Sequence, residues 1–204
     1  LGLYARMRVK STFNKYAKVK TTRNLTGAQV ARTLLDEQGL YDVLVEESKG
    51  FLSDHYDPRN RVLRLSPDVY RTPSVAAAGV AAHEMGHALQ HAGRYAPLQL
   101  RSAIVPATQF GSNLAPMIFF AGLLLSSFLN PTIGNAIAWF GVGLFGLVVL
   151  FTLVTLPVEF DASKRAKRLL KSSGTLISNE EVAGVNKVLD AAALTYVAAA
   201  VAAI

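Results

Sequence analysis

The stretch Ala82-His83-Glu84-Met85-Gly86-His87-Ala88 decides how the rest of the chain is interpreted. It has the spacing H-E-x-x-H inside a long helical pattern, so His83 and His87 fall on one face, about 6 Å apart along the axis. Two imidazoles at that spacing can bind one Zn²⁺, and Glu84 follows the first where a general base is needed. The structural alternative is a solvated His/Glu face. It is disfavoured because the neighbouring residues are small and apolar, and an uncompensated Glu84 is costly to bury.

Composition narrows the groups that could hold a metal. The 204-residue chain contains no cysteine, which excludes disulfides and thiolate sites, so zinc must be held by histidine and carboxylate. The net charge is +7, but no motif for RNA or DNA binding is present, and we expect no nucleic-acid partner. The cations instead flank a run from Ser102 to Val158 that has no charged residue. Basic flanks beside an apolar run are typical of membrane topology.

The uncharged run predicts two membrane spans joined by a turn at Asn130–Asn135. Asn135–Leu156 would be about 33 Å long as a helix, enough to cross a hydrocarbon core of about 30 Å. Ala115–Asn130 is the other span, although Asn113 and Pro116 interrupt its apolar pattern. A re-entrant first segment and a buried helical hairpin of a soluble protein are the alternatives. The second alternative fits poorly with residues that are apolar on all faces.

A catalytic zinc ion usually takes three protein ligands and a water, so one more donor is needed. Glu159 is the preferred residue because it is the first charge after the apolar run. Asp161 is its rival, and an acid that merely favours a helix N-terminus is the structural alternative. His91 lies about 12 Å from His83 along a straight helix axis, too far to share an ion. We therefore interpret His91 as a helix-end histidine or as a group that supports a ligand.

The remaining segments predict further elements. Strands at Val43–Val45 and Val62–Leu65, separated by turn signals, predict a small β hairpin. Its edge could bind an extended peptide, or the hairpin could simply pack against the helix. Residues 1–23 carry seven cations and no acid, which fits an anionic membrane surface and a solvated helix face equally well. The apolar ends near Leu1 and Ile204 indicate that both are cut from a longer polypeptide.

Capping signals predict three helices: one after Thr26, one from Thr72 to about Gln90, and one from Ser178 onward. Tyr196 on the last helix and His55 near the hairpin are weak candidates for stabilising an oxyanion. A packing tyrosine and a lone surface histidine are the alternatives.

The pairing of Ala82–His87 with Pro157-Val158-Glu159-Phe160-Asp161-Ala162-Ser163 resembles the YugP-type membrane zinc metallopeptidases. These are similar to the broader gluzincins, in which a helical glutamate is the third zinc ligand. Asp54-His55-Tyr56-Asp57-Pro58 and Leu194-Thr195-Tyr196-Val197 also resemble that family. The resemblance spans nearly the whole chain.

The resemblance implies that Glu84 is catalytic and that the zinc ligands are His83, His87 and Glu159. The chain departs from the pattern at one position. Many gluzincins have an aspartate four residues after the third ligand, where it supports a ligand histidine. Here that residue is Ser163, so Asp161 or another acid would have to take over the support.

We therefore expect a mainly α membrane protein with a small β hairpin, a gluzincin-like zinc-protease core and a transmembrane helical hairpin. Residues 1–101 and 159–204 would form the protease domain, with a third-ligand helix after residue 159. Residues 102–158 would form the hairpin. The expected function is that of a membrane-bound zinc endopeptidase with one Zn²⁺ per chain. It would hydrolyse peptide bonds with a zinc-activated water and Glu84 as general base.

The expected partners are the lipid bilayer and peptide or protein substrates, membrane proteins among them. Basic residues on both sides of the apolar run predict a multi-pass protein of the cell membrane with its active site on the cytoplasmic face. Two alternatives stay open. One is an intramembrane protease, and the other is a zinc-binding membrane scaffold or adaptor without enzymatic activity.

Overall fold

The computed structural model describes residues 1–204, apart from the side chain of Phe110. It divides into two compact units. Unit 1 comprises Leu1–Tyr95 and Val158–Ala198, and unit 2 comprises Ala96–Pro157 and Ala199–Ile204. The described chain is mainly helical with one small sheet, as predicted.

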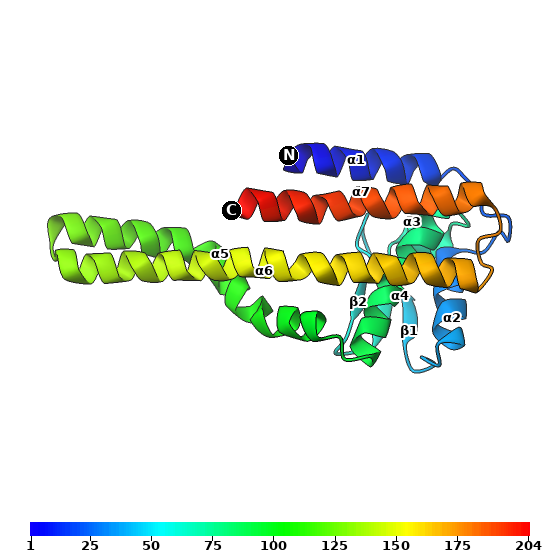
Figure 1. Ribbon diagram of the computed structural model, residues 1–204, viewed down its shortest axis with the longest axis horizontal. Helices are drawn as coiled ribbons and strands as arrows, with labels where there is room; N and C mark the ends of the chain where they lie inside the picture. Colours follow the sequence, from blue (N-terminus) through cyan, green and yellow to red (C-terminus); the bar gives the residue numbers. More distant parts are fainter. The chain divides into compact units, whose positions relative to one another are not determined.

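Ten elements follow one another along the chain, and Figure 1 labels most of them. They are α1 (Gly2–Tyr16), α2 (Gly27–Glu37), β1 (Leu44–Glu47), β2 (His55–Asp57), β3 (Val62–Leu65), α3 (Pro67–Arg71), α4 (Val75–Ala92), α5 (Ala96–Phe128), α6 (Pro131–Ser172) and α7 (Asn179–Ala203).

The sheet has three strands in the order β1-β3-β2. β1 pairs with β3 in parallel, whereas β2 pairs with β3 antiparallel. The predicted hairpin between Val43–Val45 and Val62–Leu65 is therefore wrong in its pairing. The turn signals are real, since the carboxylate of Asp57 accepts hydrogen bonds from the backbone N–H groups of Arg59 and Asn60. That turn joins β2 to β3, and the three residues of β2 are too few to show an alternating pattern.

The core of unit 1 forms where α2 and α4 pack against the sheet. α2 begins at the predicted capping box, in which Thr26 and Gln29 each bond the other's backbone N–H. Its buried face carries Val30, Leu34 and Leu35. α4 is buried along most of its length, and its first eight residues, Val75–Ala82, are all alanine, glycine or valine. Such small side chains let neighbouring elements approach the helix closely.

α7 joins this core through Val185, Val188 and Leu189. Its start has the predicted capping box, because Ser178 and Glu181 exchange hydrogen bonds between side chain and backbone. Three helices are long and apolar enough to cross a membrane: α7, α6 and the Gly111–Phe128 part of α5. The first half of α7 is committed to the core of unit 1, so the two-span arrangement stays our prediction.

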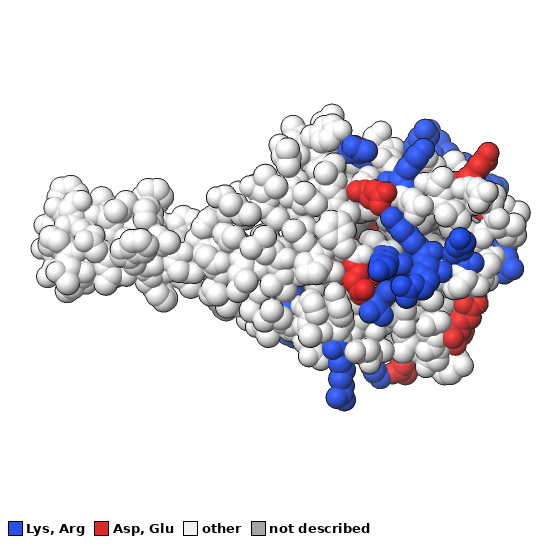
Figure 2. All heavy atoms as spheres, in the orientation of Figure 1, with Lys and Arg blue, Asp and Glu red and all other residues white. Residues whose placement is uncertain are grey.

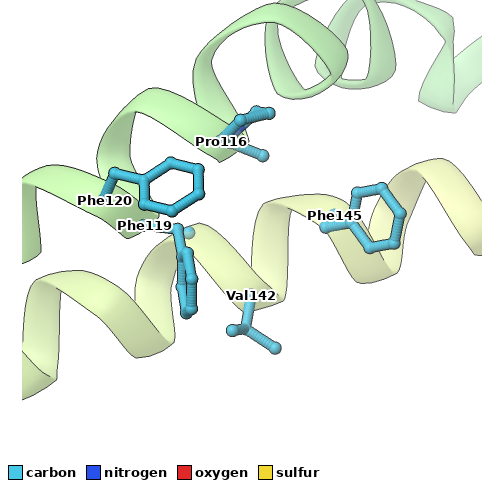
Figure 3. A pocket seen from close by; sticks show the side chains of 7 residues that line it. Pro116, Phe119, Phe120, Val142 and Phe145 are labelled. Atoms are coloured by element: carbon cyan, nitrogen blue, oxygen red, sulfur yellow. The ribbon is translucent and has the colours of Figure 1, made fainter. Parts of the chain in front are cut away.

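Unit 2 is built mainly from α5 and the first part of α6, which run antiparallel. Gly122 lies against the backbone of Ala138, and Gly134 lies against the backbone of Ser126. A cavity of about 230 Å³ lies in this hairpin, beside Pro116, a proline inside α5. Figure 3 shows the side chains that line it. On the face drawn in Figure 2 the hairpin is white, and the charged side chains gather over unit 1.

α6 continues without a break from the apolar run into unit 1. It contains the predicted span Asn135–Leu156, passes through Pro157 and ends at Ser172. The expected third-ligand helix is therefore not a separate element but the last part of the same helix. Pro157 lies inside the helix and does not end it.

Candidate metal centre

α4 sets the positions of the two motif histidines. The helix begins at Ser74, whose side-chain oxygen accepts a hydrogen bond from the backbone N–H of Ala77 at 3.1 Å. The predicted helix spacing is confirmed, because the rings of His83 and His87 lie 4.9 Å apart between centroids. The planes of the two rings are nearly perpendicular, at 86°. Both rings can therefore direct a nitrogen at one point beside the helix.

A glycine lets α6 approach this point. A Cβ atom on Gly86 would lie 2.6 Å from the carbonyl oxygen of Ala162, so no other residue fits without moving a backbone. The close contact brings Glu159 to the histidines, with its Oε2 3.1 Å from Nε2 of His83 and 3.6 Å from Nε2 of His87. One ligand atom from each of the three residues lies within 4.8 Å of the others. The structure thus brings together the three predicted ligands.

The cluster is shielded from solvent, with side-chain exposures of 11% for His83, 12% for His87 and 3% for Glu159. Burial lowers the pKa of His87, but its hydrogen bond to Glu159 and the charges of Glu84 and Glu159 outweigh this effect and raise that pKa. The same carboxylates would attract a divalent cation. Two imidazole nitrogens and one carboxylate form the donor set of a catalytic zinc site that keeps a position for water.

Gln90 fixes the orientation of His87. The amide nitrogen of Gln90 donates to the carbonyl oxygen of Val158 at 2.7 Å and to the carboxylate of Asp161 at 2.9 Å. Both partners are acceptors, so the amide oxygen must be the atom that faces Nδ1 of His87 at 3.0 Å. Nδ1 therefore carries the proton, and Nε2 keeps a lone pair for a metal.

Ser163 takes the corresponding place beside His83, with its hydroxyl 3.1 Å from Nδ1. A hydroxyl can donate or accept, so this contact orients the ring without selecting its tautomer. Where the gluzincin pattern has an aspartate, this chain therefore has a neutral hydroxyl, that of Ser163, which still contacts His83. An acid supports His87 instead, because Asp161 accepts a hydrogen bond from Gln90, which in turn contacts His87.

The remaining candidates lie outside the cluster. Asp161 accepts hydrogen bonds from Gln90 and from Arg165, the latter at 2.6 Å. His91 lies at the end of α4 with its Nδ1 2.9 Å from the hydroxyl of Tyr56, a place in keeping with its interpretation as a helix-end histidine. His55 is exposed, with its Nδ1 beside the carbonyl oxygen of Ser53.

Glu84 and His83 line a cavity of about 140 Å³, and Tyr196 and Asp54 line it too. The carboxylate of Asp54 accepts hydrogen bonds from the backbone N–H and the hydroxyl of Ser66. Burial nevertheless raises the pKa of Asp54, and the nearby charge of Glu84 acts in the same direction. Sequence reasoning missed the roles of Asp54 and Gln90. The spacing of Gln90, three residues after His87 on the same helix face, was the available signal.

Two comparisons agree with this geometry. The family described as "Putative neutral zinc metallopeptidase" matches residues 1–204. The chain is also 52% identical over 200 residues to "Putative membrane protease YugP" of Bacillus subtilis (strain 168), covering 98% of this chain and 85% of that relative. No solved structure gave a significant match. Because the family matches the chain from the first residue to the last, and because the chain contains a buried His-His-Glu cluster, the chain belongs to this family of neutral zinc metallopeptidases.

Proposed function

We propose that the protein is a membrane-bound zinc endopeptidase with a gluzincin-like site and one Zn²⁺ per chain. The ion would be held by His83, His87 and Glu159. One observation carries the proposal: three buried donors from α4 and α6 converge within 4.8 Å, and Glu84 lines the adjoining cavity. The substrates would be peptides or proteins, membrane proteins among them.

The chain's own residues account for the proton transfers of peptide hydrolysis. Zinc, when bound, supplies a Lewis acid that makes a water molecule more acidic and polarises a carbonyl. The carboxylate of Glu84 accepts a proton from the attacking water and then delivers it to the leaving amine. Gln90 and Ser163 keep the rings of His87 and His83 in place during these steps. The product is a cleaved peptide bond.

Replacement of Glu84 by glutamine tests this role. The amide cannot accept the proton, so kcat should fall by roughly 10² to 10⁴-fold while the zinc content, measured by metal analysis, stays at one ion per chain. Glu180→Gln changes an exposed acid on α7 and is the matched control, with an unchanged rate expected. Near-wild-type hydrolysis by zinc-loaded Glu84→Gln would contradict the assignment. Absence of proteolysis in the zinc-loaded wild type would favour the alternative function, a zinc-binding membrane scaffold without enzymatic activity.

The site would lie on the cytoplasmic face of the cell membrane, beside the bilayer. His83 and His87 lie outside the three apolar helices, and Glu159 lies in the last part of α6, after the uncharged run, which supports a site outside the lipid. Two crossings, by α5 and the first part of α6, would return the chain to the side from which it entered. Arg94 lies before α5 and Arg101 lies in α5 ahead of its apolar part, Gly111–Phe128. A basic stretch from Lys164 to Lys171 follows the second crossing, so the positive-inside rule selects the cytoplasm.

Cysteine labelling tests this orientation, and the cysteine-free chain suits the method. A cysteine at Thr132 should react with an impermeant thiol reagent added to intact cells. A cysteine at Ser172 should react only after permeabilisation. The reverse pattern would overturn the orientation, and labelling of both positions from outside would overturn the two-span arrangement.

A further inference from the structure

The cavity of about 140 Å³ beside His83 and Glu84 is lined in part by two helices that carry none of the proposed metal ligands. One wall consists of Val9 and Phe13 from α1, and the other of Val188, Leu189 and Ala192 from α7. These five side chains are apolar, and Tyr196 of α7 adds a hydroxyl-bearing ring to the lining. The reacting groups lie along one side of the same space, which lies entirely in unit 1.

We propose that this cavity binds the side chain of a substrate residue next to the scissile bond, and that it selects one apolar side chain of leucine to phenylalanine size. The proposal rests on the proposed peptidase function. A side chain held there would place its own backbone beside Glu84, because Glu84 and His83 are part of the lining. The occupant is therefore part of the molecule being cleaved.

The size of the cavity defines the chemical class. An apolar cavity of about 150 Å³ is known to hold a benzene molecule. The side chains of leucine, isoleucine, methionine and phenylalanine match that volume, whereas tryptophan exceeds it and alanine leaves most of it empty. In an apolar pocket a single methylene changes kcat/KM by roughly 10 to 200-fold. The preference for leucine over alanine should then exceed roughly 100-fold.

Two carboxylates limit the choice further. Asp54 and Glu84 both line the cavity, and Asp54 is held by Ser66 at the N-terminus of α3. An aspartate or glutamate side chain entering this space would meet like charges in surroundings that screen them poorly. Acidic residues should therefore be rejected at the position that the cavity serves.

A single alanine allows the cavity to be filled. Ala192 is half-buried on α7 and lines the cavity, so Ala192→Leu should occupy part of its volume. Ala183→Leu places the same change on an exposed position of the same helix and is the matched control. In the opposite direction, Val9→Ala should enlarge the cavity from α1.

The first experiment digests an unbiased peptide library with the full chain, loaded with zinc in detergent. In the wild type and in Ala183→Leu, leucine, isoleucine, methionine or phenylalanine should dominate one position beside the cleaved bond. Ala192→Leu should shift that position to glycine, alanine or valine, with kcat/KM for the leucine peptides lowered by at least roughly 10-fold. Val9→Ala should shift it towards larger side chains. An identical profile in the wild type and an active Ala192→Leu would overturn the proposal.

A binding measurement separates this proposal from the peptidase function itself. In calorimetry, zinc-loaded Glu84→Gln should bind leucine hydroxamate at least roughly 10-fold more tightly than glycine hydroxamate. Adding Ala192→Leu to that variant should abolish the difference in affinity. If zinc-loaded Glu84→Gln bound leucine hydroxamate and glycine hydroxamate with equal affinity, the pocket would be refuted even if the wild type cleaves peptides. A side-chain preference that Ala192→Leu removes, with no peptide cleaved by the wild type, would uphold the pocket and refute the peptidase.

Discussion

The two halves of α6 both pack closely against a neighbouring helix at glycine residues, but the two contacts serve different purposes. In unit 2 its first half meets α5 through Gly122 and Gly134, where helix backbones touch. In unit 1 its second half meets α4 through Gly86, against the carbonyl of Ala162. The first contact joins two apolar surfaces. The second contact also sets the distances among the candidate metal ligands. A small shift between helices that the hairpin would tolerate would here separate Glu159 from the histidines.

The two halves also differ in what their side chains require. The first half is almost entirely apolar, and its contacts with α5 are mainly packing contacts, apart from a hydrogen bond that the Ser126 hydroxyl donates to Asn135. In the second half three polar residues have specific partners: Glu159 contacts both histidines, Asp161 contacts Gln90 and Arg165, and Ser163 contacts His83. Substitutions in the second half should therefore act on metal binding, and substitutions in the first half on stability alone.

The largest effect should follow from Glu159→Ala. It leaves two imidazoles for an ion that takes three protein ligands, so the purified variant should lose most of its zinc and its activity. Asp161→Ala, two residues away, should lose less zinc, because Asp161 is not a member of the cluster and acts only through Gln90. Metal analysis of the two variants gives the comparison directly. Equal zinc content in the wild type and Glu159→Ala would remove Glu159 from the ligand set.

Gly86→Ala should come next. The added Cβ atom would lie 2.6 Å from a backbone oxygen, so α4 and α6 must separate. A displacement of about 1 Å at a catalytic site can lower the rate by roughly 10²-fold. We expect a loss of that size together with weaker zinc binding, measured by competition with a chelator.

Two glycines of the hairpin supply the controls for that substitution. Gly122→Ala should cost stability by overpacking, about 1–3 kcal/mol, without changing zinc affinity. Gly143→Ala should be neutral because no atom lies within 4 Å of its added Cβ. If Gly122→Ala weakened zinc binding as much as Gly86→Ala does, the two halves of α6 would not be independent in the way proposed here.

A smaller effect is expected from the groups behind the histidines. Gln90→Leu removes the acceptor that fixes the tautomer of His87, so zinc affinity should fall by roughly 10 to 100-fold. Ser163→Ala should cost less, because the Ser163 hydroxyl orients His83 without selecting its tautomer. Chelator competition ranks the two variants, and circular dichroism checks that each is folded. The reverse ranking would show that the Ser163 contact is the more important one.

Much of unit 1 was predictable because local rules agreed with the fold. The helical spacing of His83 and His87, the capping box at Thr26 and the one at Ser178 are confirmed. Each depends on residues close in sequence. The pattern also singled out Glu159, since it was the first charge after a long apolar run.

The strand order, the continuity of α6 and the contacts of Gln90 depend on interactions that a sequence pattern does not show. β2 has only three residues, and its existence changes which strands are neighbours. The continuity of α6 through Pro157 contradicts the usual rule that a helix ends before proline. Gln90 lies within the predicted helix, but its three partners come from two helices, and two of them are far away in the sequence.

The separation of the candidate ligands along the chain has a consequence for biosynthesis. His83 and Glu159 are 76 residues apart, with the apolar hairpin between them. At roughly 5 to 20 residues per second, a ribosome needs about 4 to 15 s to proceed from the first to the second. During that interval the nascent chain has at most two of its three donors. The order of synthesis alone would therefore keep the proposed metal centre incomplete until α5 and the apolar part of α6 have been made.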